Sequence, residues 1–185
     1  MNGFWDRAEK DPAAGEIRDG DTRYLLFRVD VIAAMLAGLD DAARAQALAA
    51  FATAVRDNGG QSLQRYLDMV DGDIDALFAT VCRTAGDLGW GAWTLDRSVD
   101  AIVLDVQNSP FATTRVSAEE PNCTPILGMF QALAETVFGA SAEVAETRCA
   151  AHAGDGSGCT FYAQRRAPRA PPKLTATQAT TGAPG

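Results

Sequence analysis

The sequence predicts an α+β domain: N-terminal helices packed on a mostly antiparallel sheet, with a helix between the sheet strands and a C-terminal hairpin. Three observations support this fold class. Apolar residues recur at helical spacing through the first half of the chain, up to Gly86. Beyond Gly86 the apolar pattern alternates with a period of two, which is typical of strands. Residues 144–164 then form two strand-like runs around a glycine-rich turn.

The first half predicts one strand and four helices. Residues 1–18 are polar and are expected to form a mobile arm, from which Phe4 and Trp5 pack on the domain or on a second subunit. A turn and a short strand are expected to follow, with the strand over 23–29. The helices are expected over 31–37, 41–56, 62–69 and 74–85, and Asn58-Gly59-Gly60 is expected to end the second of them.

The second half predicts three strands, one helix and the closing hairpin. The strands are expected over 90–95, 101–106 and 111–116. The helix is expected over 123–138, because Pro125 suits a first turn and Gly139 suits a helix end. The hairpin strands are expected over 144–151 and 159–164.

Length and composition set limits on the class of protein. With 185 residues, the chain suits one domain, expected over 19–165, and the Pro-, Ala- and Thr-rich residues 166–185 are expected to be a disordered tail. The net charge of −8 argues against nucleic-acid binding, which needs clustered Lys and Arg. No apolar run approaches the ~18 residues of a membrane span.

The cellular compartment is expected to be the cytoplasm, because the first residues lack the apolar core of a signal peptide. In that compartment the four cysteines would be reduced thiols or metal ligands rather than disulfides. Cys82 lies on the apolar stripe of a predicted helix and is expected to be a buried apolar residue.

The sequence contains no catalytic constellation. It has a single histidine, His152, and lacks a nucleophile elbow, a phosphate loop and a dinucleotide fingerprint. The glycine-rich turn at 154–158 lies between strands, so no helix dipole favours an anion there. These absences favour a binding role over catalysis.

Three cysteines suggest a metal site. The predicted helix begins at Cys123 and leads into the strand that carries Cys149, so helix and returning strand can bring the two thiols together. The hairpin turn brings Cys159 to the same end. Zinc prefers such thiolates with a fourth N, S or O ligand. The alternative is three packed thiols without metal.

Apolar side chains from facing elements suggest a cavity for a hydrophobic small molecule. The alternative is that these residues only fill the core. The candidate lining residues are Trp90, Trp93, Phe111, Met129, Phe130 and Phe161.

The end of the chain resembles a known family. The residues Glu146-Thr-Arg-Cys149, then Gly154-Asp155, then Cys159-Thr-Phe161 are similar to the terminal signature of the 4-vinyl-reductase, or hydrocarbon-binding, domain family. The resemblance spans about 88–164, with a weaker match over 19–66. The family includes sensor domains of aromatic-responsive transcription activators and a bacteriochlorophyll-synthesis protein.

The resemblance implies zinc, bound through the three cysteines and a glutamate near the break at Asn108-Ser109. Here Phe111 stands near that spot and cannot ligate. We therefore expect His152, which shares a loop with Cys149, to be the fourth ligand. The alternative ligands are Asp105, Glu119 and Glu120.

The resemblance also implies function. We expect a sensor or carrier domain for a hydrophobic or aromatic ligand, acting as a homodimer and passing its state to a protein partner. One alternative is an accessory protein of tetrapyrrole or bacteriochlorophyll synthesis that handles a vinyl-bearing precursor. Another is a non-catalytic interaction domain.

Overall fold

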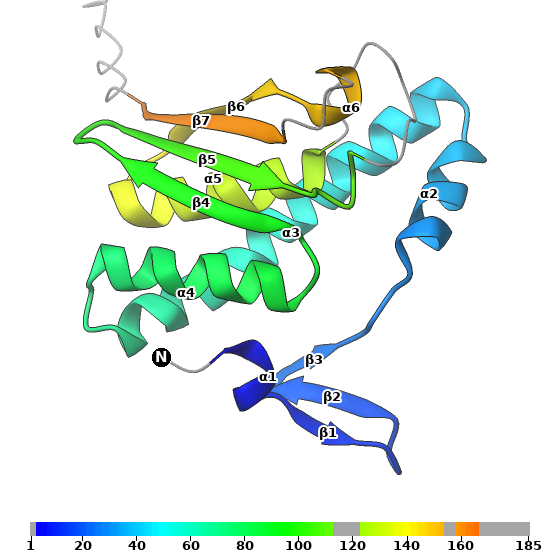
Figure 1. The fold of residues 1–185 in the computed structure, drawn as a ribbon, viewed down its shortest axis with the longest axis horizontal. Helices are drawn as coiled ribbons and strands as arrows, with labels where there is room; N and C mark the ends of the chain where they lie inside the picture. Colours follow the sequence, from blue (N-terminus) through cyan, green and yellow to red (C-terminus); the bar gives the residue numbers. More distant parts are fainter. Residues whose placement is uncertain (1–2, 113–122, 154–157, 167–185) are drawn as a thin grey trace, which may run out of the picture.

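The computed structural model describes residues 3–112, 123–153 and 158–166. Figure 1 shows a four-stranded sheet with helices on one face and a smaller three-stranded sheet below it. This arrangement confirms the predicted α+β class. The predicted tail beyond residue 166 lies outside the described residues.

The N-terminal segment is ordered and anchored, so the prediction of a mobile arm is wrong for residues 3–18. It forms α1 (Phe4–Arg7) and the small sheet of β1 (Glu9–Asp11), β2 (Glu16–Asp19) and β3 (Thr22–Tyr24). Phe4 is fully buried, and its N–H donates to the Asp87 carboxylate at 2.6 Å. An aromatic anchor of this kind stabilises a segment that is otherwise polar.

Three helices follow, and the last two carry aspartate caps. They are α2 (Val29–Ala37), α3 (Asp41–Met69) and α4 (Ile74–Asp87). The Asp40 and Asp73 carboxylates accept from the first N–H groups of α3 and α4. The strand predicted over 23–29 ends at Tyr24, and residues 25–28 form an extended linker, called the strap below.

The two helices predicted over 41–56 and 62–69 are one continuous helix, α3. Gly59 does not end it, because the missing side chain makes room for a neighbouring helix. A Cβ at Gly59 would lie 2.7 Å from Met129 Cε. At the same crossing, a Cβ at Gly128 would lie 2.2 Å from the Ala52 carbonyl oxygen. The glycines therefore allow α3 and α5 to pack with their backbones close together.

The main sheet has the order β4-β5-β7-β6, and all its neighbouring strands are antiparallel. The pairing of the last two strands is the predicted hairpin. Residues 111–112 lie in a turn rather than in the strand predicted over 111–116, and the rest of that prediction lies outside the described residues. The elements of this half are β4 (Ala92–Arg97), β5 (Ala101–Gln107), α5 (Thr124–Phe138), β6 (Ala142–Arg148), α6 (Ala150–Ala153) and β7 (Cys159–Arg165).

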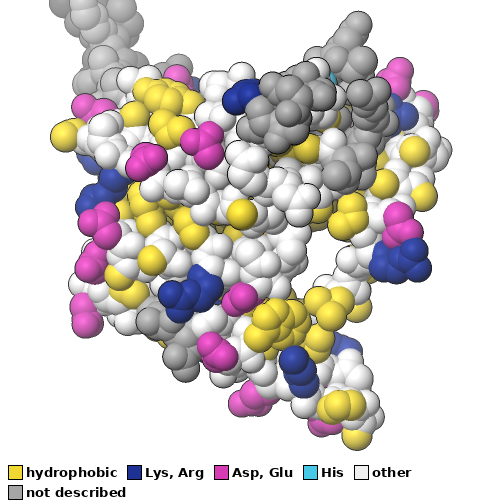
Figure 2. Space-filling model, viewed as in Figure 1, with side chains coloured by type: hydrophobic (Ala, Val, Ile, Leu, Met, Phe, Trp, Pro, Cys, Tyr) yellow, Lys and Arg dark blue, Asp and Glu magenta, His cyan; other side chains and the backbone are white. Residues whose placement is uncertain are grey.

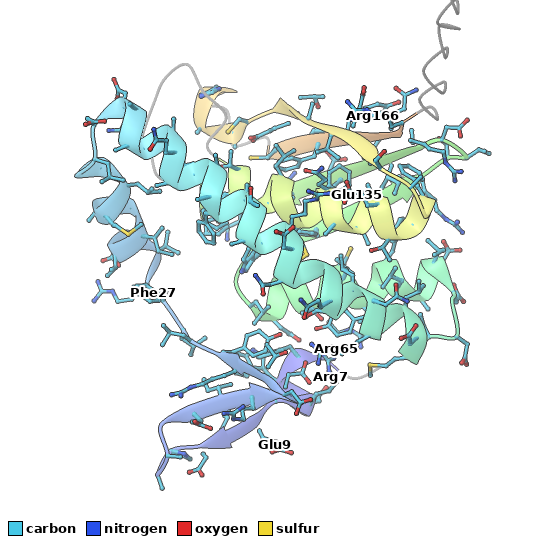
Figure 3. The ribbon with its side chains drawn as sticks, turned by 180° about the vertical axis from the view of Figure 1, so that it is seen from behind. Arg7, Glu9, Phe27, Arg65, Glu135 and Arg166 are labelled. Carbon is cyan, nitrogen blue, oxygen red and sulfur yellow. The ribbon has the colours of Figure 1, made fainter. Side chains whose placement is uncertain are left out.

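The core lies between this sheet and α5. Alternate residues of β5 and β7 face it and are fully buried, among them Leu104 and Phe161. Phe130 of α5 packs against Phe161, with ring centroids 6.2 Å apart. In Figure 3, Glu135 of α5 lies beside α3, where it forms a bidentate ion pair with Arg56 at 2.9–3.0 Å. Within the described residues, no helix is long and apolar enough to cross a membrane.

Gly128→Ala is expected to lower the free energy of unfolding by about 3 kcal/mol, because the new methyl group overpacks against the Ala52 backbone. Gly86→Ala is the matched control. Gly86 lies inside α4 with open space around its Cβ position, so the substitution should stabilise the protein by about 0.5–1 kcal/mol. Urea unfolding measures both changes, and equal effects would contradict the close crossing of α3 and α5.

Candidate functional site

Three thiols and one carboxylate meet at one end of the main sheet. One ligand atom each from Cys123, Glu146, Cys149 and Cys159 lies within 4.8 Å of all the others. The three cysteines are buried, and none of them forms a disulfide within the described part of the chain. We call this group the thiol–carboxylate cluster.

The fold brings the cluster together from separate elements. Cys123 is the N-cap residue of α5, and Cys159 is the first residue of β7. Glu146 follows Ala142 and Val144 on the inward face of β6. A bulge between Glu146 and Arg148 then interrupts the ladder just before Cys149. Bulges of this kind commonly redirect side chains at sites.

Electrostatics inside the cluster are unfavourable without a cation. The Sγ atoms of Cys123 and Cys159 lie 3.6 Å apart, and the hydrogen bond between them lowers the pKa of Cys159 to about 7. The same hydrogen bond, together with burial, raises the pKa of Cys123. Burial also raises the pKa of Glu146, whose two carboxylate oxygens are buried without a hydrogen-bond partner among the described residues.

The cluster fits a tetrahedral metal ion. Two thiolates at ~2.3 Å from one tetrahedral ion lie about 3.8 Å apart, close to the 3.6 Å between Cys123 and Cys159. A cation would also supply the partner that the Glu146 oxygens lack among the described residues. Two donors already point at the sulfurs: the Ser109 hydroxyl lies 3.2 Å from Cys123 Sγ, and the Ala150 N–H lies 3.4 Å from Cys159 Sγ.

The fourth position of the cluster is held by a residue that the sequence analysis did not select. His152 lies exposed on α6 and is not part of the cluster, whereas Glu146 is. Asp105 accepts a hydrogen bond from the Thr160 hydroxyl at 2.6 Å, and Glu119 and Glu120 lie outside the described residues. The signal for Glu146 was its place two residues after Val144 on an inward strand face.

A second feature is an apolar pocket of about 640 Å³. This volume is within the ~300–1,000 Å³ range of small-molecule pockets. Its walls come from the strap, α2, α3, α4 and the ends of β4 and β5. None of the described residues that line it carries a charge. The pocket is therefore suited to an uncharged, hydrophobic ligand.

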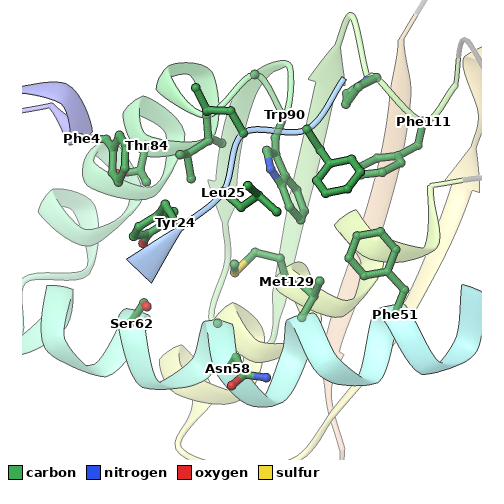
Figure 4. A pocket seen from close by; sticks show the side chains of 18 of the residues that line it. Phe4, Tyr24, Leu25, Phe51, Asn58, Ser62, Thr84, Trp90, Phe111 and Met129 are labelled. Atoms are coloured by element: carbon green, nitrogen blue, oxygen red, sulfur yellow. The ribbon is translucent and has the colours of Figure 1, made fainter. Parts of the chain in front are cut away.

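The two ends of the pocket differ (Figure 4). At one end three aromatic rings gather: Phe111 lies 5.6 Å from Trp90 and 6.2 Å from Phe51, both edge to face. At the other end lie the hydroxyl groups of Tyr24 and Ser62. Burial raises the pKa of Tyr24 to about 12, so this phenol stays neutral. A ligand would meet aromatic faces at one end and hydroxyl groups at the other.

The pocket is open on the side of the strap. Figure 2 shows an opening between the body of the domain and the segment that leads to α2. Leu25 and Phe27 line the pocket, yet they are 77% and 59% exposed. Figure 3 shows Phe27 on this linker, away from the sheet and α5.

The predicted ligand-binding residues fall into two groups. Trp90, Trp93, Phe111 and Met129 line the pocket. Phe130 and Phe161 instead pack against each other in the closed core. The sequence analysis did not anticipate the contributions of the strap, α2 and α3, because the apolar residues of α2 and α3 were interpreted only as core-facing stripes.

The fold and these two features define a class of small α+β domain in which an apolar pocket lies beside a thiol–carboxylate cluster. Residues 102–165, from β5 to β7, match the family model of the vinyl-4-reductase domain. The chain therefore contains a vinyl-4-reductase domain, and the resemblance found in the sequence is confirmed. Among curated proteins, none matches the chain in sequence.

Solved structures support the fold. The phenol-responsive sensory domain of the transcription activator PoxR, solved with phenol, is similar with a TM-score of 0.75 and 15% identity, covering 88% of this chain and 86% of that one. A trafficking protein particle complex subunit 3 from Naegleria fowleri, covalently bound to palmitic acid, has a TM-score of 0.49 and 10% identity, with coverage of 75% and 90%.

A vinyl-4-reductase family protein from Methanocaldococcus jannaschii has a TM-score of 0.47 and 17% identity, with coverage of 74% and 76%. The last two scores are too low to support an argument. The first similarity shows that most of the chain shares the fold of a sensory domain.

Proposed function

We propose that this chain binds an uncharged, hydrophobic or aromatic small molecule in the apolar pocket and acts as a sensor or carrier domain. The observation that carries the proposal is the uncharged lining of a cavity of about 640 Å³. A charged ligand would lose its hydration there without gaining an ionic partner. The fold similarity to a phenol-responsive sensory domain supports a sensory role.

Extraction of the purified protein tests the class of ligand. Mass spectrometry of the extract is expected to identify a neutral apolar compound. Visible absorbance of the purified protein would instead indicate a tetrapyrrole and the accessory role in its synthesis. A protein that yields no compound and binds no hydrophobic dye would favour the non-catalytic interaction domain.

Trp90→Ala is expected to weaken binding of the neutral dye N-phenyl-1-naphthylamine about tenfold, because it removes one aromatic wall of the pocket. Dye fluorescence during titration measures the affinity. Tyr162→Ala is the matched control, because Tyr162 is an aromatic residue that is 39% exposed on β7 and does not line the pocket. Equal loss in both variants would rule out this pocket as the dye site.

We further propose that the thiol–carboxylate cluster holds zinc. Three buried thiols and one inward-facing carboxylate form a closed set of four ligands, which is typical of structural rather than catalytic zinc. When bound, zinc would neutralise part of the negative charge of the ligands. Cys123, Cys149 and Cys159 then link α5, the end of β6 and β7.

Zinc binding is expected to raise the thermal midpoint of the wild-type protein, and Cys149→Ala is expected to abolish that rise, because it removes a ligand. His152→Ala is the control and should leave the rise unchanged, because His152 is outside the cluster. Differential scanning calorimetry with and without chelator measures the effect. Less than about one-tenth equivalent of metal in protein purified without chelator would eliminate the zinc proposal.

We also propose a homodimer through the strap and α2. Large apolar side chains are exposed there in sequence, which is unusual for a monomer surface. A second copy packed on this face would also cover the opening of the pocket. The exposed residues are Leu25, Leu26, Phe27, Val29, Val31 and Met35. The reduced thiols are consistent with the cytoplasm as the compartment in which this dimer acts.

The double variant Leu26→Ser, Phe27→Ser is expected to be monomeric, because it removes apolar surface from the proposed interface. Light scattering after size-exclusion chromatography should give about twice the chain mass of 19.5 kDa for the wild type and one chain mass for the variant. Val99→Ser, at an 86% exposed position, is the control and should remain dimeric. A monomeric wild type would contradict the proposal.

A further inference from the structure

The loop that follows β5 touches both the thiol–carboxylate cluster and the apolar pocket. Ser109 is 3% exposed, and its hydroxyl lies 3.2 Å from the sulfur of Cys123, which is fully buried. The next two residues, Pro110 and Phe111, line the pocket. One side chain of the cluster is therefore in contact with a loop that forms part of the pocket wall.

The start of this loop has little freedom to move. Gly91 packs against it so closely that a Cβ there would lie 2.6 Å from the carbonyl oxygen of Gln107. Asn108 has a φ of 56°, a left-handed conformation that asparagine tolerates better than most residues. Because the backbone is held on this side, the contact of Ser109 with Cys123 helps to determine where the following residues lie.

The pocket wall depends on the position of Phe111. Its ring packs edge to face against Trp90 and Phe51, at 5.6 Å and 6.2 Å between centroids. These contacts close the aromatic end of the pocket (Figure 4). A shift of the loop would therefore change the shape of the site in which the ligand is proposed to bind.

A bound metal changes what Ser109 can do. A metal-bound Cys123 is a thiolate and only accepts hydrogen bonds, so the Ser109 hydroxyl must donate to it. In the metal-free cluster, the Cys123 thiol can also donate, and either atom of this pair can be the donor. Hydrogen bonds to an ionised acceptor are shorter and stronger than those between neutral groups. Metal binding should therefore fix Ser109 in one orientation.

We propose that Ser109 is a positioning residue that couples the two sites. Its hydroxyl orients the Cys123 sulfur for the metal, and through this contact metal occupancy fixes the wall formed by Pro110 and Phe111. The inference rests on the proposed ligand and zinc sites and adds a regulation to them: the metal-loaded protein binds its ligand more tightly. By linkage, the ligand then also tightens metal binding.

The test uses the full chain, Zn²⁺ and the neutral dye N-phenyl-1-naphthylamine. Zinc-loaded wild type should bind the dye at least about fivefold more tightly than chelator-stripped wild type. Ser109→Ala should weaken zinc binding by about 10–100-fold, measured by competition with a zinc indicator. At saturating zinc, this variant should bind the dye as weakly as the stripped wild type does.

Three further variants separate positioning from general destabilisation. Ser109→Thr keeps the hydroxyl and should restore zinc affinity and dye affinity. Phe111→Leu should weaken only dye binding, because it alters the wall and not the cluster. Thr136→Val should change neither, because this hydroxyl bonds the Ala132 carbonyl near the other end of α5 from Cys123.

The outcomes distinguish this coupling from the proposals on which it rests. Equal dye affinity in loaded and stripped wild type would overturn the coupling and leave the ligand pocket standing. Zinc affinity unchanged in Ser109→Ala would also overturn it. A dye that binds neither form of the wild type would remove the proposed pocket function, and the coupling with it.

Discussion

The close crossing of α3 and α5 is the constraint on which both sites depend. Gly128 allows the α5 backbone to approach Ala52, and Gly59 accepts the side chain of Met129. This contact sets the position of α5 along its whole length. Its first turn then presents Cys123 to the cluster, and Met129 reaches the pocket. A wider helix crossing would move the cluster thiol and the pocket floor together, so one packing contact positions two chemically unrelated sites.

The cluster illustrates the cost of burying ionisable groups. Burial raises the pKa of Glu146, and the pKa values of Cys123 and Cys159 move in opposite directions because they share a hydrogen bond. Without a cation, these groups are stable only when mostly protonated. With all four ligands ionised, a divalent ion would leave a net charge of about −2, and the donors at Ser109 and Ala150 would reduce it further. The same four side chains therefore oppose their own ionisation without metal and favour it with metal.

The sequence predicts the parts of this structure that depend on local pattern. The α+β class, the final hairpin and the convergence of three cysteines follow from periodicity and from a glycine-rich turn. The parts that it misses depend on contacts between distant residues. Gly59 is a helix end by local rules, but the contact with Met129 explains its presence inside a helix. Phe4 belongs to a polar segment, but it is buried through contacts with a distant helix. Glu146 is polar by type, but it occupies an inward strand position and joins the cluster.

The pocket must be open in the free chain for an energetic reason. An enclosed cavity of about 640 Å³ would cost about 15 kcal/mol at ~24 cal/mol per Å³, which equals the upper limit of the stability of a typical domain. The opening at the strap admits water, so the chain avoids this cost but leaves Leu25, Leu26 and Phe27 exposed. A ligand at a concentration about 100-fold above its Kd would stabilise the folded chain by about 2.7 kcal/mol. Part of that binding energy comes from covering the strap, since the strap and the aromatic end face the same cavity. The most loosely packed segment of the domain therefore has the most to gain from ligand binding, which is the property that a sensor requires.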